Sequence, residues 1–428
     1  MGVIKAFRAV RYNDRLLKYA AYVMTPPYDV ISPEQQEFYY DQSPFNVIRL
    51  DLGKESPGDS EANNRYTRAR DFLANWRRDG VLVEDGADSI YGYSQVYRDP
   101  LGKTLTRDGF VALLKLEEWQ TGTVYPHEQT FSGPKEDRLR LVRATGHQMS
   151  LIFSLFSGAT GEITPLISRI VGFPEVTRYT DSDGVEHIFT RCADPEIHTR
   201  ICAAMGKEKI FIADGHHRYE TFLAFRDEME RQGVAGDAHR YAAMYFTPLG
   251  GDSVTILPCH RVVTLDRPIN EDVAVQSLGR YFTVKTFMKN DANTSGFIGS
   301  LSEKGKGSFG LYLGGDCYYL LTLTNRDQIE PFFPPDMNRL IKGLDVSVIQ
   351  DVIITGIFGI KNPTVVCSQD AAEALSKARE GETAVFLLNS TTIQEVKEAS
   401  LVGERMPQKS TYFYPKLASG LALYRMVP

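Results

Sequence analysis

The densest group of side chains that could do chemistry is the run Asp214-Gly215-His216-His217-Arg218. It follows the apolar segment KIFIA and precedes YETFLAFRDEMERQG, whose apolar spacing predicts a helix. A helix N-terminus offers unpaired backbone N–H groups and a partial positive charge, and glycine lets a ligand approach the backbone. The histidines and the arginine add side-chain donors. The run therefore predicts a phosphate-binding turn; the simpler alternative is an aspartate cap with solvated basic groups.

A second candidate is the loop PHEQT, which holds Glu128 after Pro126 and His127. A carboxylate on a proline-constrained loop can act as a general base if it lies near the phosphate. Taken alone, the loop is better explained as a turn with a solvated glutamate. A zinc site from His127, Glu128, His216 and His217 is conceivable, but the chain has no HExxH-like spacing, so the pattern does not favour zinc.

The segment MPQKSTYFYPK near the end of the chain is the third candidate. Lys409, Ser410 and Thr411 can all bind a phosphate or a carboxylate, and the aromatic residues after them should anchor the loop. A tight surface loop over packed aromatic rings is the open alternative. Because ligand sites favour domain interfaces, we expect this loop to complete the phosphate site across a domain junction.

Two further motifs contain polar residues beside prolines. In PPYDVIS, Asp29 follows two prolines on a rigid turn, where it either caps the turn or binds substrate. In LPCHRVV, His260 and Arg261 fall inside an expected strand, which favours a histidine at the edge of the core.

The bulk composition excludes several classes of protein. The 428 residues predict two or three domains, and a net charge of −6 disfavours a nucleic-acid partner. Five scattered cysteines predict reduced thiols and no disulfide framework. No stretch resembles a signal peptide or a membrane helix, and Ala6 does not fit the myristoylation motif. We therefore expect a cytoplasmic protein without a membrane partner.

The order of elements predicts a mixed α/β fold. We expect a helix over 61–78, a hairpin from 89–97 and 109–119, a hairpin over 309–323 and a buried helix over 344–360. The expected division is an N-terminal α/β segment (1–108), a phosphate-binding domain (109–265) and a C-terminal α/β domain (266–428).

Five ordered motifs, PPYDVIS, PHEQT with PKEDRLRL, IADGHHRYET, LPCHRVV and MPQKSTYFYPK, together resemble the domain-of-unknown-function 1015 family. The resemblance runs from about Ala6 to the C-terminus. Because that family is described mostly by name, the resemblance alone implies little about activity.

Residues 109–233 also resemble, more weakly, the ParB-like and sulfiredoxin-like nucleotide-binding fold, which implies a central mixed sheet. Some members phosphorylate free L-serine, and the resemblance puts their proposed base on Glu128 and their phosphate turn on Asp214 to Arg218. Sulfiredoxin activity needs a cysteine where this chain has His216 and His217, and the acidic charge disfavours ParB-like DNA binding. The long insertion at about 157–209 leaves the acceptor open.

The function we expect is a small-molecule phosphotransferase acting on free L-serine or a similar hydroxy compound, with ATP, ADP or pyrophosphate as donor. Phosphoryl transfer depends mostly on positioning and charge neutralisation. The expected residues fall into three roles. Glu128, Asp214 and His216 are catalytic, with Asp214 holding Mg²⁺; Asp29 and His127 bind substrate; Gly215, His216, His217, Arg218, Lys409, Ser410 and Thr411 bind phosphate. The alternatives are a non-catalytic nucleotide or phospho-metabolite sensor, which does not need Glu128, and a metal-dependent phosphoester hydrolase, which needs three convergent ligands. The oligomeric state stays open.

Overall fold

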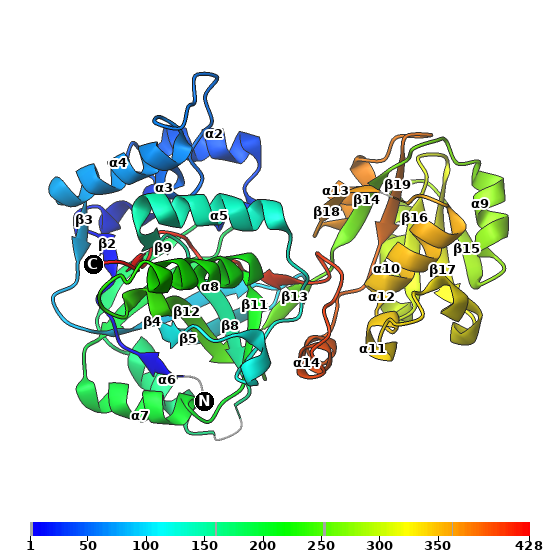
Figure 1. The fold of residues 1–428 in the computed structure, drawn as a ribbon. Helices are drawn as coiled ribbons and strands as arrows, with labels where there is room; N and C mark the ends of the chain where they lie inside the picture. The colour runs from blue at the N-terminus through cyan, green and yellow to red at the C-terminus, as the bar shows by residue number, and fades with distance from the viewer. Residues whose placement is uncertain (1–2, 159–160, 251–253, 362) are drawn as a thin grey trace. The chain divides into compact units, whose positions relative to one another are not determined.

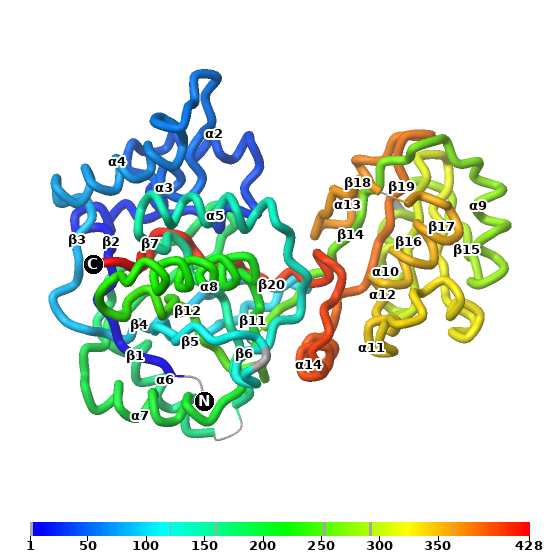
Figure 2. Tube along the Cα trace, in the orientation of Figure 1, coloured from blue at the N-terminus to red at the C-terminus, as the bar shows by residue number. Residues whose placement is uncertain are grey.

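The computed structural model describes residues 3–158, 161–250, 254–361 and 363–428 (Figure 1). The chain divides into two compact units. The first unit comprises residues 1–126, 130–255 and 415–428, and the second comprises 127–129 and 256–414. The trace in Figure 2 shows the last segment of the chain beside helix α8 of the first unit. The three-part division into 1–108, 109–265 and 266–428 stays a prediction.

A nine-stranded mixed sheet organises the first unit, in the order β6-β11-β8-β12-β5-β4-β10-β9, with β1 paired to β5. The β6–β11 and β8–β12 pairs are parallel, and the other pairs are antiparallel. The mixed α/β class expected from the sequence is therefore confirmed. The strands are β1 (Ile4–Lys5), β4 (Ile90–Arg98), β5 (Thr104–Lys115), β6 (Val124–Tyr125), β8 (Ile152–Phe156), β9 (Glu175–Thr180), β10 (Glu186–Cys192), β11 (Ile210–Asp214) and β12 (Tyr241–Pro248).

Helices pack against this sheet, and α5 lies beside α8 (Figure 1). Helix α6 packs on β4 and β5, and α8 packs on β8. The helices are α1 (Ala20–Val23), α2 (Pro33–Gln42), α3 (Ile48–Asp51), α4 (Arg65–Arg78), α5 (Ser132–Thr145), α6 (Ile163–Val171), α7 (Pro195–Met205) and α8 (His216–Arg231). Two short strand pairs, β2 (Val10–Tyr12) with β3 (Leu82–Glu84) and β7 (His147–Gln148) with β21 (Tyr424–Arg425), complete the unit.

In the first unit, the structure shows the outcome of two expectations from the sequence, a hairpin and a helix. The expected hairpin is present as β4 and β5. The helix expected over 61–78 begins only at Arg65, because Asn64 accepts hydrogen bonds from the backbone of Tyr66 and Thr67 and so caps the helix.

The second unit contains a six-stranded antiparallel sheet in the order β15-β17-β16-β19-β14-β18. Its strands are β14 (His260–Thr264), β15 (Phe282–Met288), β16 (Ser308–Tyr312), β17 (Cys317–Leu323), β18 (Thr364–Ser368) and β19 (Thr383–Leu387). Its helices are α9 (Glu271–Leu278), α10 (Asp291–Lys304), α11 (Arg339–Lys342), α12 (Asp345–Ser347), α13 (Ala371–Ser376) and α14 (Ile393–Leu401), and β20 (Tyr412–Tyr414) lies near its end. Phe297 of α10 stacks on Tyr318 of β17 within its apolar core.

Two sequence expectations in the second unit can be compared with the structure. The buried helix expected over 344–360 is confirmed over residues 345–357, but only α12 is α-helical and Val348–Ile357 is π-helical. The single strand expected through LPCHRVV is split into β13 (Thr255–Leu257) and β14, because Pro258 cannot donate a ladder hydrogen bond. The hairpin expected over 309–323 is confirmed as β16 and β17. Among the described helices, none has the length and apolar character needed to cross a membrane.

The carboxylate of Asp345, at the start of α12, is buried in the second unit, so its protonation should affect the stability of the protein. The backbone N–H of Gly307 donates to both of its oxygens, at 3.0 and 3.2 Å. Burial raises the pKa of Asp345 to about 6 from an ordinary value of 3.8. The folded state therefore binds this proton more tightly than the unfolded state, so ionising Asp345 costs stability as the pH rises through that range.

We therefore expect Asp345→Asn to stabilise the protein at pH 8 by about 1–3 kcal/mol and to change little at pH 4, because the amide is neutral and keeps an acceptor for Gly307. Urea unfolding of both proteins at the two pH values measures this. An effect of equal size at pH 4 and pH 8 would show that the carboxyl does not titrate in this range.

Candidate functional site

The turn between β11 and α8 has the geometry that the sequence predicts. Gly215 has a φ of 96°, in the left-handed region that favours glycine, and stands at the N-cap position of α8. A Cβ atom at this position would lie 3.0 Å from Nε of Arg218. The first hydrogen bond of the helix runs from the N–H of Tyr219 to the carbonyl of Gly215, at 2.9 Å. Glycine is thus required both by the backbone and by the guanidinium that lies against it.

Beneath the turn, Asp214 holds two cations. Its Oδ2 accepts from Nη2 of Arg218, and its Oδ1 accepts from Nζ of Lys416 at 2.6 Å. Arg218 is 2% exposed and also donates to the carbonyl of Leu151. Burial alone would raise the pKa of Asp214, but the charges of Lys416 and Arg218 outweigh it and lower that pKa well below its usual range. Asp214 is therefore ionised and balances positive charge inside the protein.

This pairing bears on Mg²⁺. Magnesium takes octahedral oxygen ligands and is usually bound through one or two carboxylates. Both oxygens of Asp214 are occupied by cationic side chains. In the described part of the chain, no three His, Cys, Asp or Glu side chains come together as a group that could hold a metal. The residues present do not fit Mg²⁺ at Asp214.

The two histidines of the turn differ in exposure. His216 is 3% exposed, whereas His217 is partly exposed. The backbone N–H of Phe131, which precedes α5, donates to Nε2 of His217 at 3.0 Å. This contact leaves the proton on Nδ1. Burial lowers the pKa of His217, although Asp29 and Glu220 oppose the shift. His217 is thus a neutral donor at the start of α8.

Glu220, in the first turns of α8, connects the turn to the residues around α5. Its carboxylate accepts from Thr130 Oγ1, from Lys135 Nζ at 3.0 Å and from Trp119 Nε1 at 3.2 Å. Asp29 is exposed, and its charge opposes the lowering of the His217 pKa by burial and helps to raise the pKa of Arg218. The PPYDVIS motif is therefore near the turn, as a substrate-binding role for Asp29 requires.

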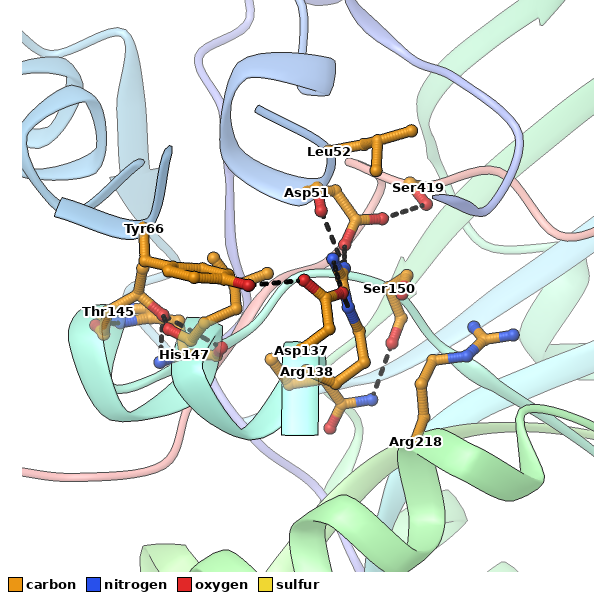
Figure 3. Close-up of polar contacts among 12 residues, drawn as sticks. Asp51, Leu52, Tyr66, Asp137, Arg138, Thr145, His147, Ser150, Arg218 and Ser419 are labelled. Carbon is orange, nitrogen blue, oxygen red and sulfur yellow. Dashed lines mark hydrogen bonds and ion pairs between the residues drawn. The ribbon is translucent and has the colours of Figure 1, made fainter. Parts of the chain in front are cut away.

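A buried network around Arg138 supports the same region (Figure 3). Arg138 is 6% exposed and lies between two carboxylates, with Nη1 2.9 Å from Asp51 Oδ1 and Nη2 2.6 Å from Asp137 Oδ2. Tyr66 donates to Asp137 at 2.7 Å, and Ser419 donates to Asp51 at 3.2 Å. The sequence motifs did not reveal this network, because PKEDRLRL has the pattern of a charged, amphipathic helix. The available signal was the helical spacing of Arg138 with the buried Leu141 and Val142.

In the second unit, residues 127–129 (the PHE loop) are hydrogen-bonded to residues 409–411 (the KST loop). The N–H of Lys409 donates to Glu128 Oε1 at 2.7 Å, and His127 Nε2 lies 3.0 Å from Thr411 Oγ1. Lys409 has a φ of 54°, the left-handed region, and is the one such non-glycine residue in the described chain. Ser410 is 3% exposed and donates to the carbonyl of Pro407. The sequence-predicted residues of these two motifs therefore lie together in this unit. Their action at the Asp214–Arg218 turn stays a prediction.

Gly215→Ala tests the geometry of the turn. We expect a loss of about 3 kcal/mol in the free energy of unfolding, because alanine is strained at this φ and its Cβ displaces Arg218 from a buried ion pair. Gly233→Ala is the matched control, because Gly233 follows α8 at a φ of 66° and no atom lies within 4 Å of the place that its methyl group would take. It should lose only about 1 kcal/mol. Equal losses in urea unfolding would contradict the proposed packing of Arg218 on the turn.

A comparison with known proteins identifies the family of this chain. Residues 4–347 match the model of the family described as protein of unknown function (DUF1015). No curated protein matches the chain. Similar solved structures include "Free serine kinase in complex with AMP", at 15% identity and a TM-score of 0.36, covering 74% of this chain and 91% of that one. Another is SbnI with C-terminal truncation from Staphylococcus aureus, at 12% identity and a TM-score of 0.37, covering 73% and 87%. At these scores the likeness assigns no activity, whereas the family match spans most of the chain. The chain belongs to the DUF1015 family.

Proposed function

We propose that the protein is a small-molecule phosphotransferase that binds the phosphates of its donor at the Gly215 turn. The observation that carries the proposal is the start of α8. The helix begins on a left-handed glycine, which offers no side-chain cap, with His217 beside it and the buried cations Arg218 and Lys416 beneath it. Unpaired N–H groups, the helix dipole and fixed cations together favour a phosphate at this position.

Arg218 supplies a specific contact for that phosphate. Nη1 and Nη2 donate to Leu151 and Asp214, but the buried Nε has no hydrogen-bond partner among the described residues. A buried donor without a partner costs about 1–3 kcal/mol, and an oxyanion at the turn would satisfy it. The neutral His217 would donate from Nδ1 to the same anion. ATP, ADP and pyrophosphate all present such oxygens.

The acceptor is a small hydroxy compound, and free L-serine is the leading candidate. The exposed carboxylate of Asp29 can bind its ammonium group. Glu128 would take the proton of the hydroxyl as the new O–P bond forms and the donor's P–O bond breaks. Glu128 is only two residues before Thr130, which is hydrogen-bonded to Glu220 of α8. Two residues of chain span at most about 7 Å, so the covalent chain keeps Glu128 close to Thr130.

A second function is favoured by the contact between Glu128 and the N–H of Lys409. If this carboxylate only braces the KST loop, the same phosphate turn would serve a non-catalytic sensor of a nucleotide or phospho-metabolite. The base distinguishes the two functions, because a sensor does not need it.

The first test is turnover. The full chain is incubated with and without Mg²⁺, with ATP, ADP or pyrophosphate and with free amino acids including L-serine, and the products are read by mass spectrometry. We expect phosphorylated L-serine, and we expect Glu128→Gln to lower kcat at least about 10²-fold while donor affinity, measured by calorimetry, changes little. Donor binding without turnover across the panel would support the sensor. Unchanged turnover in Glu128→Gln would remove the assigned base.

The second test concerns the KST loop. Lys409→Ala should reduce turnover or phosphate affinity at least about tenfold, because a lysine can act as a point charge toward phosphate. The melting temperature should hardly change, since Lys409 is exposed and alanine is strained at this φ much as lysine is. Phe413→Ala is the contrasting control: Phe413 is 1% exposed, and its loss should cost about 3–5 kcal/mol of stability. Full binding and activity in Lys409→Ala would return the loop to a structural role.

A further inference from the structure

Arg261, in the LPCHRVV motif, is a buried arginine whose hydrogen bonds are incomplete. It lies on β14 of the second unit and is 4% exposed. Nη1 is 3.2 Å from Gln350 Oε1, at the upper limit for a hydrogen bond, and Nη2 is 3.4 Å from the carbonyl of Gln408, beyond that limit. Nε has no hydrogen-bond partner in the described chain. A side chain with five N–H donors therefore makes only two weak contacts.

Arg261 also lacks the counter-ion that the buried Arg138 and Arg218 have. Arg138 lies between Asp51 and Asp137, and Arg218 is paired with Asp214. Among the described residues, no carboxylate forms an ion pair with Arg261, whose partners are an amide oxygen and a carbonyl. A buried ion without a partner costs several kcal/mol, so a retained one calls for an explanation.

The carboxylate whose charge acts on Arg261 does not compensate it. This group is Asp351, next to Gln350 on the π-helical segment. Burial raises the pKa of Asp351 despite the attraction of Arg261, as expected for two groups that are not in contact. The ten-residue π-helical segment carries both Gln350 and Asp351.

A second cation converges on the same place. The carbonyl that Nη2 of Arg261 approaches belongs to Gln408, the residue before Lys409. Burial raises the pKa of the Cys367 thiol, while Arg261 and Lys409 both act to lower it and Glu128 acts to raise it. Arg261, Lys409 and Glu128 are therefore all close enough to act electrostatically on the same thiol. Cys367 lies opposite Arg261 in the β14–β18 pair. Lys409 is exposed and Cys367 is partly exposed, so two of these residues reach the surface.

We propose that Arg261 and Lys409 together bind one oxyanion of a small ligand, either a phosphate group or the carboxylate of an amino acid. The guanidinium would supply Nε–H and one terminal N–H to two oxygens, and Lys409 would supply a point charge from the loop. Glu128, bonded to the N–H of Lys409, would fix the loop that presents this charge. The proposal goes beyond the phosphotransferase function, because it requires a bound anion and no transfer.

The proposal separates the effect of Arg261 on stability from its effect on binding. Without ligand, the buried charge is a cost, so Arg261→Met should melt at the same temperature as the parent protein or higher. A purely structural arginine would instead give a lower melting temperature when removed. With ligand, Arg261→Met should lose the share of the thermal stabilisation that this site contributes, whereas a ligand at the Gly215 turn stabilises both proteins.

The experiment uses the full chain in a phosphate-free, low-salt buffer, with inorganic phosphate, L-serine and L-serinamide as probes. Thermal unfolding reports binding, and alkylation of Cys367 by iodoacetamide, followed by peptide mass spectrometry, reports where the probe binds. A phosphate site gives protection by phosphate only. A carboxylate site gives protection by L-serine and none by L-serinamide. In either case Arg261→Met should lose the protection of Cys367, and His217→Ala, which alters only the Gly215 turn, should keep it.

Three outcomes would overturn the proposal: no probe protects Cys367 in the parent protein, Arg261→Met keeps the protection, or His217→Ala abolishes it. If Arg261→Met does not fold, Arg261→Lys decides the matter, because lysine keeps the charge and loses the bidentate geometry. The proposal then expects affinity for the protecting probe to fall at least about tenfold, and unchanged affinity contradicts it. Since none of these measurements depends on turnover, the phosphotransferase function can fail without affecting the result.

Discussion

The buried carboxylate of Asp214 is the group on which the architecture of the turn depends. One of its oxygens pairs with Arg218 and the other with Lys416. Removing this carboxylate would take an ion-pair partner from two enclosed cations, which is strongly destabilising. With it, the guanidinium of Arg218 can lie against Gly215, and β11, α8 and the end of the chain are joined at one point. An anion at the turn would meet a prearranged site, which reduces the cost of ordering it on binding.

The parts of this arrangement that follow from neighbouring residues could be predicted from the sequence. Gly215 after an apolar run and before a periodic one indicated a strand, a tight turn and a helix, and these are present as β11 and α8. The hairpin of β4 and β5 followed from alternating apolar residues around a turn. Where the capping preference of Asn64 competed with the apolar periodicity, the capping residue decided where α4 begins. Capping preferences and periodicity are properties of a few consecutive residues, so a single sequence contains them.

The rest depends on contacts between distant residues, which no local pattern encodes. Lys416 is 202 positions from Asp214, and Arg138 is 87 positions from Asp51. Each of these residues would be equally acceptable on a solvated surface, so its type does not reveal its partner. For Arg261, the sequence predicted a position in a strand, but it could not predict that the side chain lacks a counter-ion. The π-helical segment after α12 likewise depends on packing, because its apolar sequence also suits an ordinary helix.

The return of residues 415–428 to the first unit has a consequence for synthesis of the protein. Proteins are made from the N-terminus, and domains generally fold in that order. Here the first unit lacks Lys416, the Pro415 carbonyl that accepts from Arg107 and the β21 partner of β7 until the ribosome has made the whole second unit. A nascent chain that ends before residue 416 would contain Asp214 and Arg218 without Lys416. The turn at Gly215 can therefore reach its final form only after Lys416 has been synthesised, so a chain that stops before this residue would lack one of the two cations paired with Asp214.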